Sequence, residues 1–311
     1  MSWLPARPGP DPAWLAARVA WWQAREAAAL AHAPGAVAPA APTAEAHRQA
    51  RAWLPLGPLR EDLDDALRAW FDLDALDLDL AATDLGRWRS WPDARARLPG
   101  VRRFALPSGL LLTLAAPDPA RDLLFELAAP PAIGSTLGRY GARLARLAAL
   151  APGATAWDVG CGTGEGTWEL ALALPPGADV VGTTPCPLQR LMAERRDRPH
   201  DPARGAALRA LVGPDPGRAV RFVRHDLLRD PPPGTFHAIA SHGLLGEGIA
   251  APADVARAVA ALAGALAPGG VLSVADRFRD DHHARAAAQV AAAAQAAGLT
   301  PLAEEEGLFR R

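Results

Sequence analysis

The stretch that decides the fold is A-T-A-W-D-V-G-C-G-T-G-E-G-T-W-E-L-A-L-A-L, residues 154–174. Its apolar start is typical of the end of a buried strand, and Gly160, Gly162 and Gly164 then form a G-x-G-x-G turn. Glycine has no Cβ, so such a turn bends sharply and lets the backbone approach a ligand closely. A helical pattern follows from Gly166. Strand, glycine turn and helix together predict a cofactor-binding corner of an α/β sheet.

The residues that flank the glycines narrow the class of ligand. The dinucleotide fingerprint G-x-G-x-x-G requires a glycine where this chain has Glu165. Asp158 precedes the first glycine, and carboxylates beside a glycine loop repel a pyrophosphate but suit a ligand with an ammonium and a sulfonium group. The stretch D-V-G-C-G-T-G-E-G resembles the first motif of the class I S-adenosylmethionine-dependent methyltransferases. The cofactor-binding residues that this resemblance implies here are Asp158, Gly160, Cys161, Gly162 and Gly164.

A second loop, G-T-T-P-C-P-L-Q-R at 182–190, follows the next expected strand. Many methyltransferases of this class place an acidic residue here to hold the ribose, and this chain has none. The loop is similar to the G-x-T-x-S-x-x-Q pattern of the tocopherol, sterol and cyclopropane-fatty-acid methyltransferases, with Thr184 and Gln189 matching and Cys186 where serine is usual. That resemblance implies that Thr184 and Gln189 bind the ribose, and a hydroxyl with a carboxamide can satisfy a diol without adding charge. The alternative is an ordinary turn shaped by its two prolines.

The third loop, R-H-D-L-L, places Asp226 directly after an expected strand at 220–223. The resemblance implies that the Asp226 carboxylate accepts a hydrogen bond from the adenine amine and that the backbone N–H of Leu227 contacts the adenine ring. An aspartate at a strand end can also simply cap a helix or form a turn.

The fourth loop, S-H-G-L-L-G-E-G at 241–248, begins where the fourth strand of this sheet should end, next to the methyl group in the class that the chain resembles. His242 is therefore the first candidate to touch the substrate or accept a proton, because imidazole can act as a base near neutral pH. Glu247 and Asp276 are the second candidates for this catalytic role. The alternatives are that His242 only hydrogen-bonds the backbone and that Asp276 caps a turn.

Strand and helix patterns alternate through the second half of the chain, as in a doubly wound parallel sheet of an α/β protein. The resemblance covers roughly residues 136–311 and implies a Rossmann-like, mostly parallel, seven-stranded sheet with its last strand antiparallel. The short end at 299–311 leaves open whether this sheet is completed. We expect two domains: 1–132, a mainly helical N-terminal lid or substrate region, and 133–311, the S-adenosylmethionine-binding methyltransferase domain.

The first third of the chain is expected to be mainly helical. Apolar spacing predicts helices at 11–31, 43–54 and 59–71, whereas residues 101–116 favour two short strands around a Pro-Ser-Gly turn. Nine acidic residues lie between Glu61 and Asp84, and their spacing fits a solvated helix face better than a calcium loop. Eight of the ten tryptophans precede residue 92, and they either form the core of the helices or line an apolar substrate pocket beneath a helical lid.

Composition limits the partners and the location of the protein. A net charge of −1 gives no reason to expect nucleic acid as a partner. The chain has no run of about 18 apolar residues, so we expect no membrane insertion. The two cysteines lack metal-ligand spacing, so we expect no metal site and a reducing setting. The start lacks a signal segment, and a cytoplasmic location follows as the default expectation, with the oligomeric state open and a homodimer possible.

The expected function is transfer of a methyl group from S-adenosyl-L-methionine to a small, apolar or lipid-like metabolite in a bacterium, by in-line displacement. Two alternatives remain. A protein or peptide carboxyl methyltransferase would also have a helical N-terminal domain before G-C-G-T-G-E and H-D-L-L, although strand four lacks the C-R-N sequence of that family. A non-catalytic partner protein could keep the sheet, and even the cofactor, as structural elements.

Overall fold

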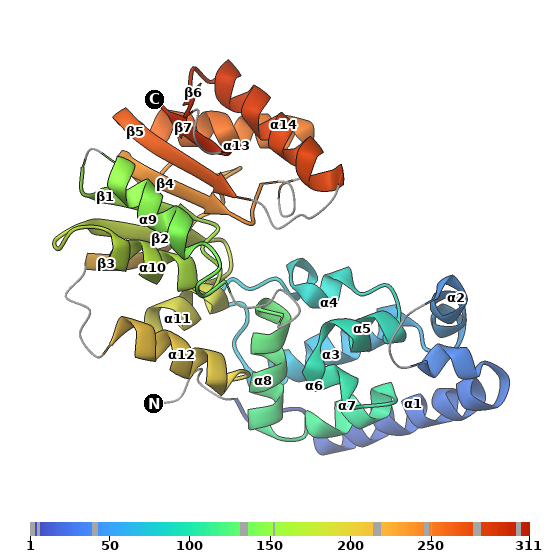
Figure 1. The fold of residues 1–311 in the computed structure, drawn as a ribbon. Helices are drawn as coiled ribbons and strands as arrows, with labels where there is room; N and C mark the ends of the chain where they lie inside the picture. Colours follow the sequence, from blue (N-terminus) through green and yellow to red (C-terminus); the bar gives the residue numbers. More distant parts are fainter. Residues whose placement is uncertain are drawn as a thin grey trace. The chain divides into compact units, whose positions relative to one another are not determined.

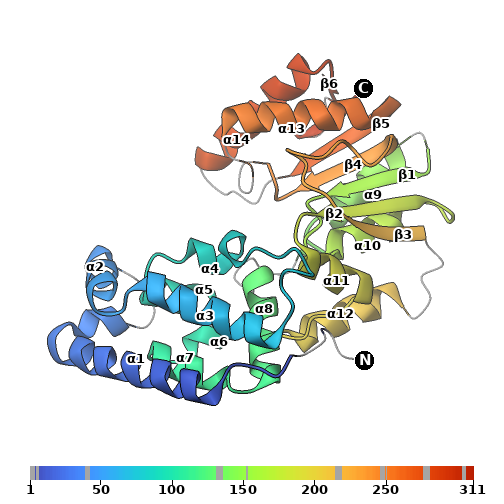
Figure 2. The ribbon, with the colours of Figure 1, turned by 180° about the vertical axis from the view of Figure 1, so that it is seen from behind.

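A computed structural model describes residues 4, 7–38, 43–130, 136–151, 153–213, 219–245, 249, 251–275, 281–302 and 306–311 of the chain. The chain divides into two compact units (Figures 1 and 2). Unit 1 comprises Met1–Gly134 with Arg198–Pro202, and unit 2 comprises Ser135–Asp197 with Ala203–Arg311. Within the described ranges, no helix has the length and apolar character needed to cross a membrane.

Unit 1 is built from helices. Their bounds are α1 (Pro12–His32), η1 (Pro34–Val37), α2 (Ala44–Trp53), α3 (Leu56–Trp70), η2 (Leu80–Ala82), α4 (Asp84–Arg87), α5 (Trp91–Arg97), α6 (Pro99–Arg102), α7 (Pro107–Thr113) and α8 (Pro117–Ala128). The first three predicted helices are confirmed as α1, α2 and α3. Helix α1 begins where expected because the Asp11 carboxylate accepts the N–H of Ala13 at 2.9 Å and Pro12 occupies the first helical position.

The predicted strands at 101–116 are wrong, because this segment forms α6 and α7. Pro107 starts α7, where its fixed φ suits a helix and its missing N–H costs nothing. The N–H and hydroxyl of Ser108 both donate to the Glu26 carboxylate, each at 2.6 Å. This carboxylate lies on α1, 82 positions away in sequence. The start of α7 is therefore stabilised by a distant residue, which the local sequence pattern could not reveal.

Two acids of the 61–84 run are buried against tryptophans. Asp62 is 4% exposed and accepts hydrogen bonds from Trp22 Nε1 at 2.7 Å and Arg18 Nε at 2.6 Å. Asp84 accepts from Trp88 Nε1 at 3.0 Å. The expected solvated face is therefore wrong for these two acids, whose carboxylates satisfy buried indole N–H groups. Among the tryptophans before residue 92 that the structure describes, three are buried core residues: Trp22, Trp88 and Trp91. The part of the chain that is described contains no group of acids, histidines and cysteines able to hold a metal ion.

Unit 2 contains a seven-stranded sheet in the order β3-β2-β1-β4-β5-β7-β6. Its strands are β1 (Thr155–Val159), β2 (Asp179–Thr184), β3 (Ala219–Arg224), β4 (Phe236–His242), β5 (Leu266–Ala275), β6 (Thr300–Pro301) and β7 (Leu308–Arg310). The first five strands pair in parallel, whereas β7 is antiparallel to both β5 and β6. The expected α/β class and mostly parallel seven-stranded sheet are confirmed. The short C-terminal end completes the sheet with two very short strands.

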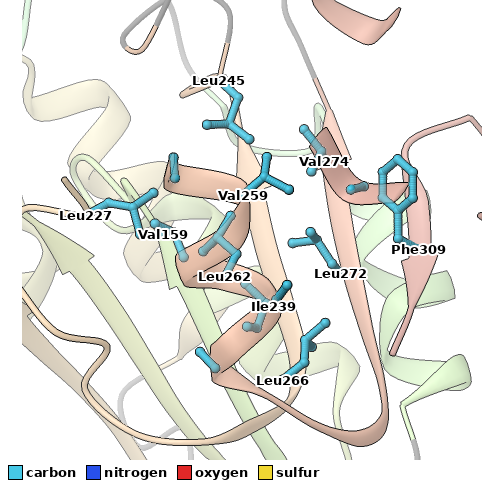
Figure 3. Packing of buried hydrophobic residues seen from close by; sticks show 14 of the residues in the cluster. Val159, Leu227, Ile239, Leu245, Val259, Leu262, Leu266, Leu272, Val274 and Phe309 are labelled. Atoms are coloured by element: carbon cyan, nitrogen blue, oxygen red, sulfur yellow. The ribbon is translucent and has the colours of Figure 1, made fainter. Parts of the chain in front are cut away.

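Helices cover both faces of this sheet (Figures 1 and 2). They are α9 (Gly141–Leu150), α10 (Glu165–Ala173), α11 (Pro187–Arg195), α12 (Pro202–Val212), α13 (Pro252–Ala265) and α14 (Asp281–Ala296). Ile239 of β4 packs with Leu262 of α13 and Leu272 of β5 on one face (Figure 3). The neighbouring Ala238 packs with Leu144 of α9 and Leu170 of α10 on the other face. Successive strand residues thus point to opposite layers, as strand geometry requires.

Candidate functional site

The parallel strands β3, β2, β1 and β4 are neighbours in the sheet, so their carboxyl ends lie at the same edge. The four loops singled out in the sequence follow these four ends. In open α/β sheets this edge is where ligands bind, because the loops diverge there and leave a crevice. Topology therefore brings the glycine loop, residues 185–190, Asp226 and His242 to one edge of the sheet.

The glycine turn has a backbone that only glycine adopts readily. Gly160, Gly162 and Gly164 all have positive φ values, of 68°, 54° and 82°. A Cβ on Gly164 would lie 2.6 Å from the Cβ of Ala193, whereas a Cβ on Gly162 would meet no atom within 4 Å. Gly164 is thus required for packing, and Gly162 faces open space where a ligand can approach the backbone. Cys161, between Gly160 and Gly162, donates its N–H to the carbonyl of Thr183 at 2.8 Å, which ties the loop to β2.

Asp158 is the last but one residue of β1 and is 5% exposed. Its Oδ2 accepts the hydroxyl of Thr167 at 2.6 Å. The pKa of this carboxyl is raised to about 7, mainly by burial, with the Thr167 hydrogen bond lowering the pKa and the nearby Glu169 charge raising it. A cation placed opposite Asp158 would favour the ionised form, so this group suits the binding of a ligand ammonium.

Glu165 does not share this role with Asp158, although the two flank the glycines in sequence. Its Oε2 accepts both the N–H and the hydroxyl of Thr136, at 2.7 and 2.6 Å. Its Oε1 lies 3.9 Å from Nε of Arg204 on α12. Both oxygens of Glu165 thus lie against groups of the protein, Thr136 and Arg204.

In the second loop the structure brings Thr184 and Gln189 together. The Thr184 hydroxyl donates to Gln189 Oε1 at 2.7 Å and accepts the N–H of Cys186 at 3.3 Å. Thr184 is only 1% exposed, whereas Gln189 is half-buried. The Gln189 side-chain oxygen thus accepts a hydrogen bond from Thr184. The hydrogen-bond donor of this carboxamide is its Nε2 amide.

Asp226 forms a turn after β3. Its Oδ1 accepts the N–H of Leu228 at 3.0 Å, and its own N–H donates to Asp230 Oδ2 at 2.7 Å. Nε of the exposed Arg229 lies 3.4 Å from Oδ2. The side chain of Leu227 is buried in the core on the α13 face (Figure 3), which fixes the backbone at this position. Asp226 therefore does form a turn, the role that was the alternative to an adenine contact. Its carboxylate is nevertheless half-exposed at this edge of the sheet.

His242 is part of a partly buried polar chain at the end of β4. Its Nε2 lies 2.9 Å from the hydroxyl of Ser273, which also accepts Nε of Arg143 at 3.2 Å. Burial, assisted by the Arg143 charge, lowers the pKa of His242 to about 3. The imidazole is consequently neutral at physiological pH. The Ser273 hydroxyl accepts from Arg143 and can donate its own proton to His242 Nε2 in the tautomer that carries the imidazole proton on Nδ1.

Sequence reasoning missed Tyr140, the one tyrosine of the chain. Its ring lies 4.6 Å from the His242 ring, centroid to centroid, at the N-terminal end of α9. Tyr140 is 9% exposed, and its hydroxyl has no hydrogen-bond partner among the described residues. No motif marks this position, and only the packing of α9 on β4 and β5 reveals it. The other two catalytic candidates, Glu247 and Asp276, lie outside the described residues.

Neither a protein-family model nor a curated protein matches the chain. Solved structures do match in part. CalS10, a SAM-bound amino pentose methyltransferase from Micromonospora echinaspora, is 26% identical over 48% of this chain and 54% of its own, with a TM-score of 0.35. The [4+2]-cyclase SpnF is 25% identical over 52% of this chain and 56% of its own, with a TM-score of 0.36.

A third solved structure is NodS, an N-methyltransferase from Bradyrhizobium japonicum WM9, in complex with S-adenosyl-L-homocysteine. It is 19% identical over 65% of this chain and 96% of its own, with a TM-score of 0.40. The chain spans about half the length of CalS10 and SpnF. Two of these three similar proteins are methyltransferases, one with the cofactor bound and one with its demethylated product.

Proposed function

We propose that this chain is an S-adenosylmethionine-dependent methyltransferase with a Rossmann-like domain at 133–311. The observation that carries the proposal is the glycine turn beside a buried carboxyl. A Cβ on Gly162 would meet no protein atom within 4 Å, and Asp158, with its pKa raised to about 7, lies near the end of β1, the strand that leads into the turn. A cationic ligand fits this pair better than a pyrophosphate does, because burial makes an opposing positive charge favourable.

Each loop has a part in holding the cofactor. Asp158 is opposite the ammonium group, and the backbone of Gly160, Cys161, Gly162 and Gly164 lies along the methionine portion. Gln189 donates its amide to a ribose hydroxyl, with Thr184 setting the orientation of the carboxamide. The half-exposed Asp226 carboxylate receives the adenine amine, and the backbone N–H at Leu227 contacts the ring. These groups would hold the cofactor with one buried acid, Asp158, one half-exposed acid, Asp226, and otherwise neutral groups.

S-adenosylmethionine, when bound, supplies an electrophilic methyl group on its sulfonium sulfur. The protein then has to align the acceptor in line with the departing sulfur and exclude water, and positioning of this kind can supply about 7 to 11 kcal/mol. A proton needs to be removed only if the acceptor carries one. His242 is neutral and can accept a hydrogen bond or a proton, but a pKa near 3 makes it a weak base.

The acceptor in this proposal is a small, apolar or lipid-like metabolite. Three observations support it. The second loop has the T-x-C-x-x-Q pattern, the tryptophans are concentrated before residue 92, and the net charge of −1 offers nothing to a polyanion. Residues 1–132 are assigned to a lid or substrate region because they are helical and rich in aromatic side chains.

Calorimetric titration with S-adenosylmethionine and with S-adenosylhomocysteine tests the proposal. We expect both to bind with one site per chain. If neither binds to the folded protein, the enzyme proposal fails and the non-catalytic alternative is favoured. A carboxyl methyltransferase would instead give a labelled product that releases methanol in mild alkali, whereas an N- or C-methylated metabolite would not.

The Asp226→Ala variant tests the adenine contact. We expect affinity for S-adenosylhomocysteine to fall about 10- to 100-fold, the equivalent of losing a hydrogen bond to a charged group. Asp179→Ala is the matched control, because Asp179 lies at the opposite, amino end of β2 and is half-exposed. Equal affinities in the two variants would remove Asp226 from the site.

A further inference from the structure

Residues 136–139, just before α9, form a tight turn that is bonded to α10. The N–H of Arg139 donates to the carbonyl of Thr136 at 2.9 Å, and Gly138 has a φ of 71°, which closes the turn. The N–H and hydroxyl of Thr136 donate to Glu165 Oε2, and the N–H of Gly138 donates to Glu169 Oε1 at 2.5 Å. Three donors of one turn thus reach two carboxylates on one helix.

The two carboxylates, Glu165 and Glu169, both lie where they can bind the 136–139 turn. Glu165 and Glu169 are four residues apart on α10 and so lie on one face of that helix. Glu165 is 2% exposed and directly follows Gly164, the last glycine of the turn that ends β1. Burial raises the pKa of Glu169, and the hydrogen bond from Gly138 opposes that rise. A buried carboxylate left without such donors is costly, so these contacts are strong ones.

The same turn adjoins the glycine loop and leads into Tyr140. Leu137 packs against the cluster that contains Trp168 and Phe222, and Cys161 of the glycine loop packs against that cluster too. One residue beyond the turn, the Tyr140 ring contacts the His242 ring. The turn is therefore connected to the start of α10 on one side and to the end of β4 on the other.

We propose that Glu165 and Glu169 are positioning residues of the cofactor site, which hold the 136–139 turn against α10 and thereby keep Tyr140 on His242. This role rests on the proposed function. A ligand on the glycine loop would lie beside the first turn of α10, where Glu165 holds the 136–139 turn, so the fastening of this turn would affect how firmly the ligand is held. Loosening the carboxylate contacts lets Tyr140 and the glycine loop move independently, and the bound ligand leaves faster.

The test uses the single tyrosine. Protein labelled with a fluorinated tyrosine gives one fluorine NMR resonance, which reports the surroundings of Tyr140 alone. Thr136→Val removes the hydroxyl donor and keeps the shape, Thr136→Ser keeps the donor, and Glu165→Gln removes the charge. Glu194→Gln is the control, because Glu194 is half-exposed on α11 and pairs only with Arg190 among the contacts described.

We expect Thr136→Val and Glu165→Gln to shift or broaden the resonance and to raise the dissociation rate of S-adenosylhomocysteine about tenfold, as loss of a charge-assisted hydrogen bond implies. Thr136→Ser and Glu194→Gln should match the wild type. Valine and serine variants that behave alike, or an unchanged resonance and dissociation rate in folded Glu165→Gln, would overturn the positioning role. Failure of the wild type to bind S-adenosylhomocysteine would refute the proposed function, and the resonance without ligand would still decide whether Glu165 positions Tyr140.

Discussion

Asp158 carries a carboxyl group whose charge depends on what lies opposite it. With its side chain buried and one oxygen bonded to Thr167, the group titrates near pH 7 instead of near 4. A bound cation lowers that pKa again, because it replaces the solvation that burial removed. Binding of a ligand ammonium and loss of the Asp158 proton are therefore coupled.

This coupling predicts a pH-dependent affinity. Between pH 6 and pH 8 the wild type should bind S-adenosylhomocysteine more tightly as pH rises, by up to about tenfold per pH unit on the acid side of the titration, because less work is needed to ionise Asp158. Asp158→Asn should bind about 10- to 100-fold more weakly and lose this pH dependence. Calorimetry at several pH values measures both effects, and Asp179→Asn serves as the control. Parallel pH profiles in the wild type and Asp158→Asn would contradict the assignment.

Residue types and spacing predicted that the glycine turn, the 185–190 loop, Asp226 and His242 lie at one edge of the sheet, but not which contacts each side chain makes there. Thr184 and Gln189 lie together as the loop pattern implies. Thr184 is buried, however, and its hydroxyl donates to the side-chain carbonyl of Gln189. The proposed basicity of His242 rested on the ordinary pKa of imidazole, and the packing of Arg143 and Tyr140 over it could not be known from the loop sequence. Burial and charge at a side chain are set by neighbours that are distant in sequence.

At the scale of the element, helices are joined by buried acids. Asp62 on α3 receives Trp22 and Arg18 from α1, and Glu26 on α1 receives the start of α7. Periodicity predicted α1 and α3 because each has an apolar stripe and good boundary residues. It failed at α7, where the helix start is stabilised by a carboxylate from another helix and the local residues look like a strand pair with a turn.

The Asp62 contact gives a prediction with a control on the same helix. Asp62→Ala leaves the Trp22 N–H buried without its partner, so we expect the free energy of unfolding to fall by about 1 to 3 kcal/mol. Asp64→Ala removes an ion pair with Arg68 that is more than a third exposed, and its effect should stay within about 0.5 kcal/mol. Urea unfolding of both variants measures the difference. Equal losses would show that the Asp62 carboxylate is not needed to satisfy the indole.

At the scale of the whole molecule, both units contain carboxyl groups whose pKa is higher in the folded protein than in the unfolded chain, because they are buried. In unit 1 burial raises the pKa of Glu126, and in unit 2 it raises those of Asp158 and Glu169. A folded state with a raised carboxyl pKa binds more protons than the unfolded state above pH 4, so its stability decreases as pH rises through the folded pKa. His242 acts in the opposite sense, since its lowered pKa reduces stability below pH 6.5.

We therefore expect the free energy of unfolding to fall as pH rises from about 6.5 to 8, where His242 no longer opposes the effect of Asp158. Over its whole titration Asp158 contributes at most on the order of 4 kcal/mol. Asp158→Asn should flatten this decline and stabilise the ligand-free protein at pH 8. His242→Gln should leave the decline above pH 7 unchanged, because the imidazole is neutral there in both states. Thermal and urea unfolding across this range provide the measurement, and an unaltered slope in Asp158→Asn would show that the carboxyl is not held protonated.

The α/β class, the glycine turn, the order of the loops along the chain and the helices with complete local signals could be predicted from the order of the amino acids. These features follow from short-range physics: glycine conformations, capping, and the periods of strands and helices. Three features needed the folded chain: the short C-terminal end completes the sheet, Glu165 binds Thr136 while Asp158 lies beside the glycine turn, and His242 is neutral in contact with Tyr140. Burial, pKa and hydrogen-bond partners depend on which residues from distant parts of the chain become neighbours, and local sequence does not contain that information.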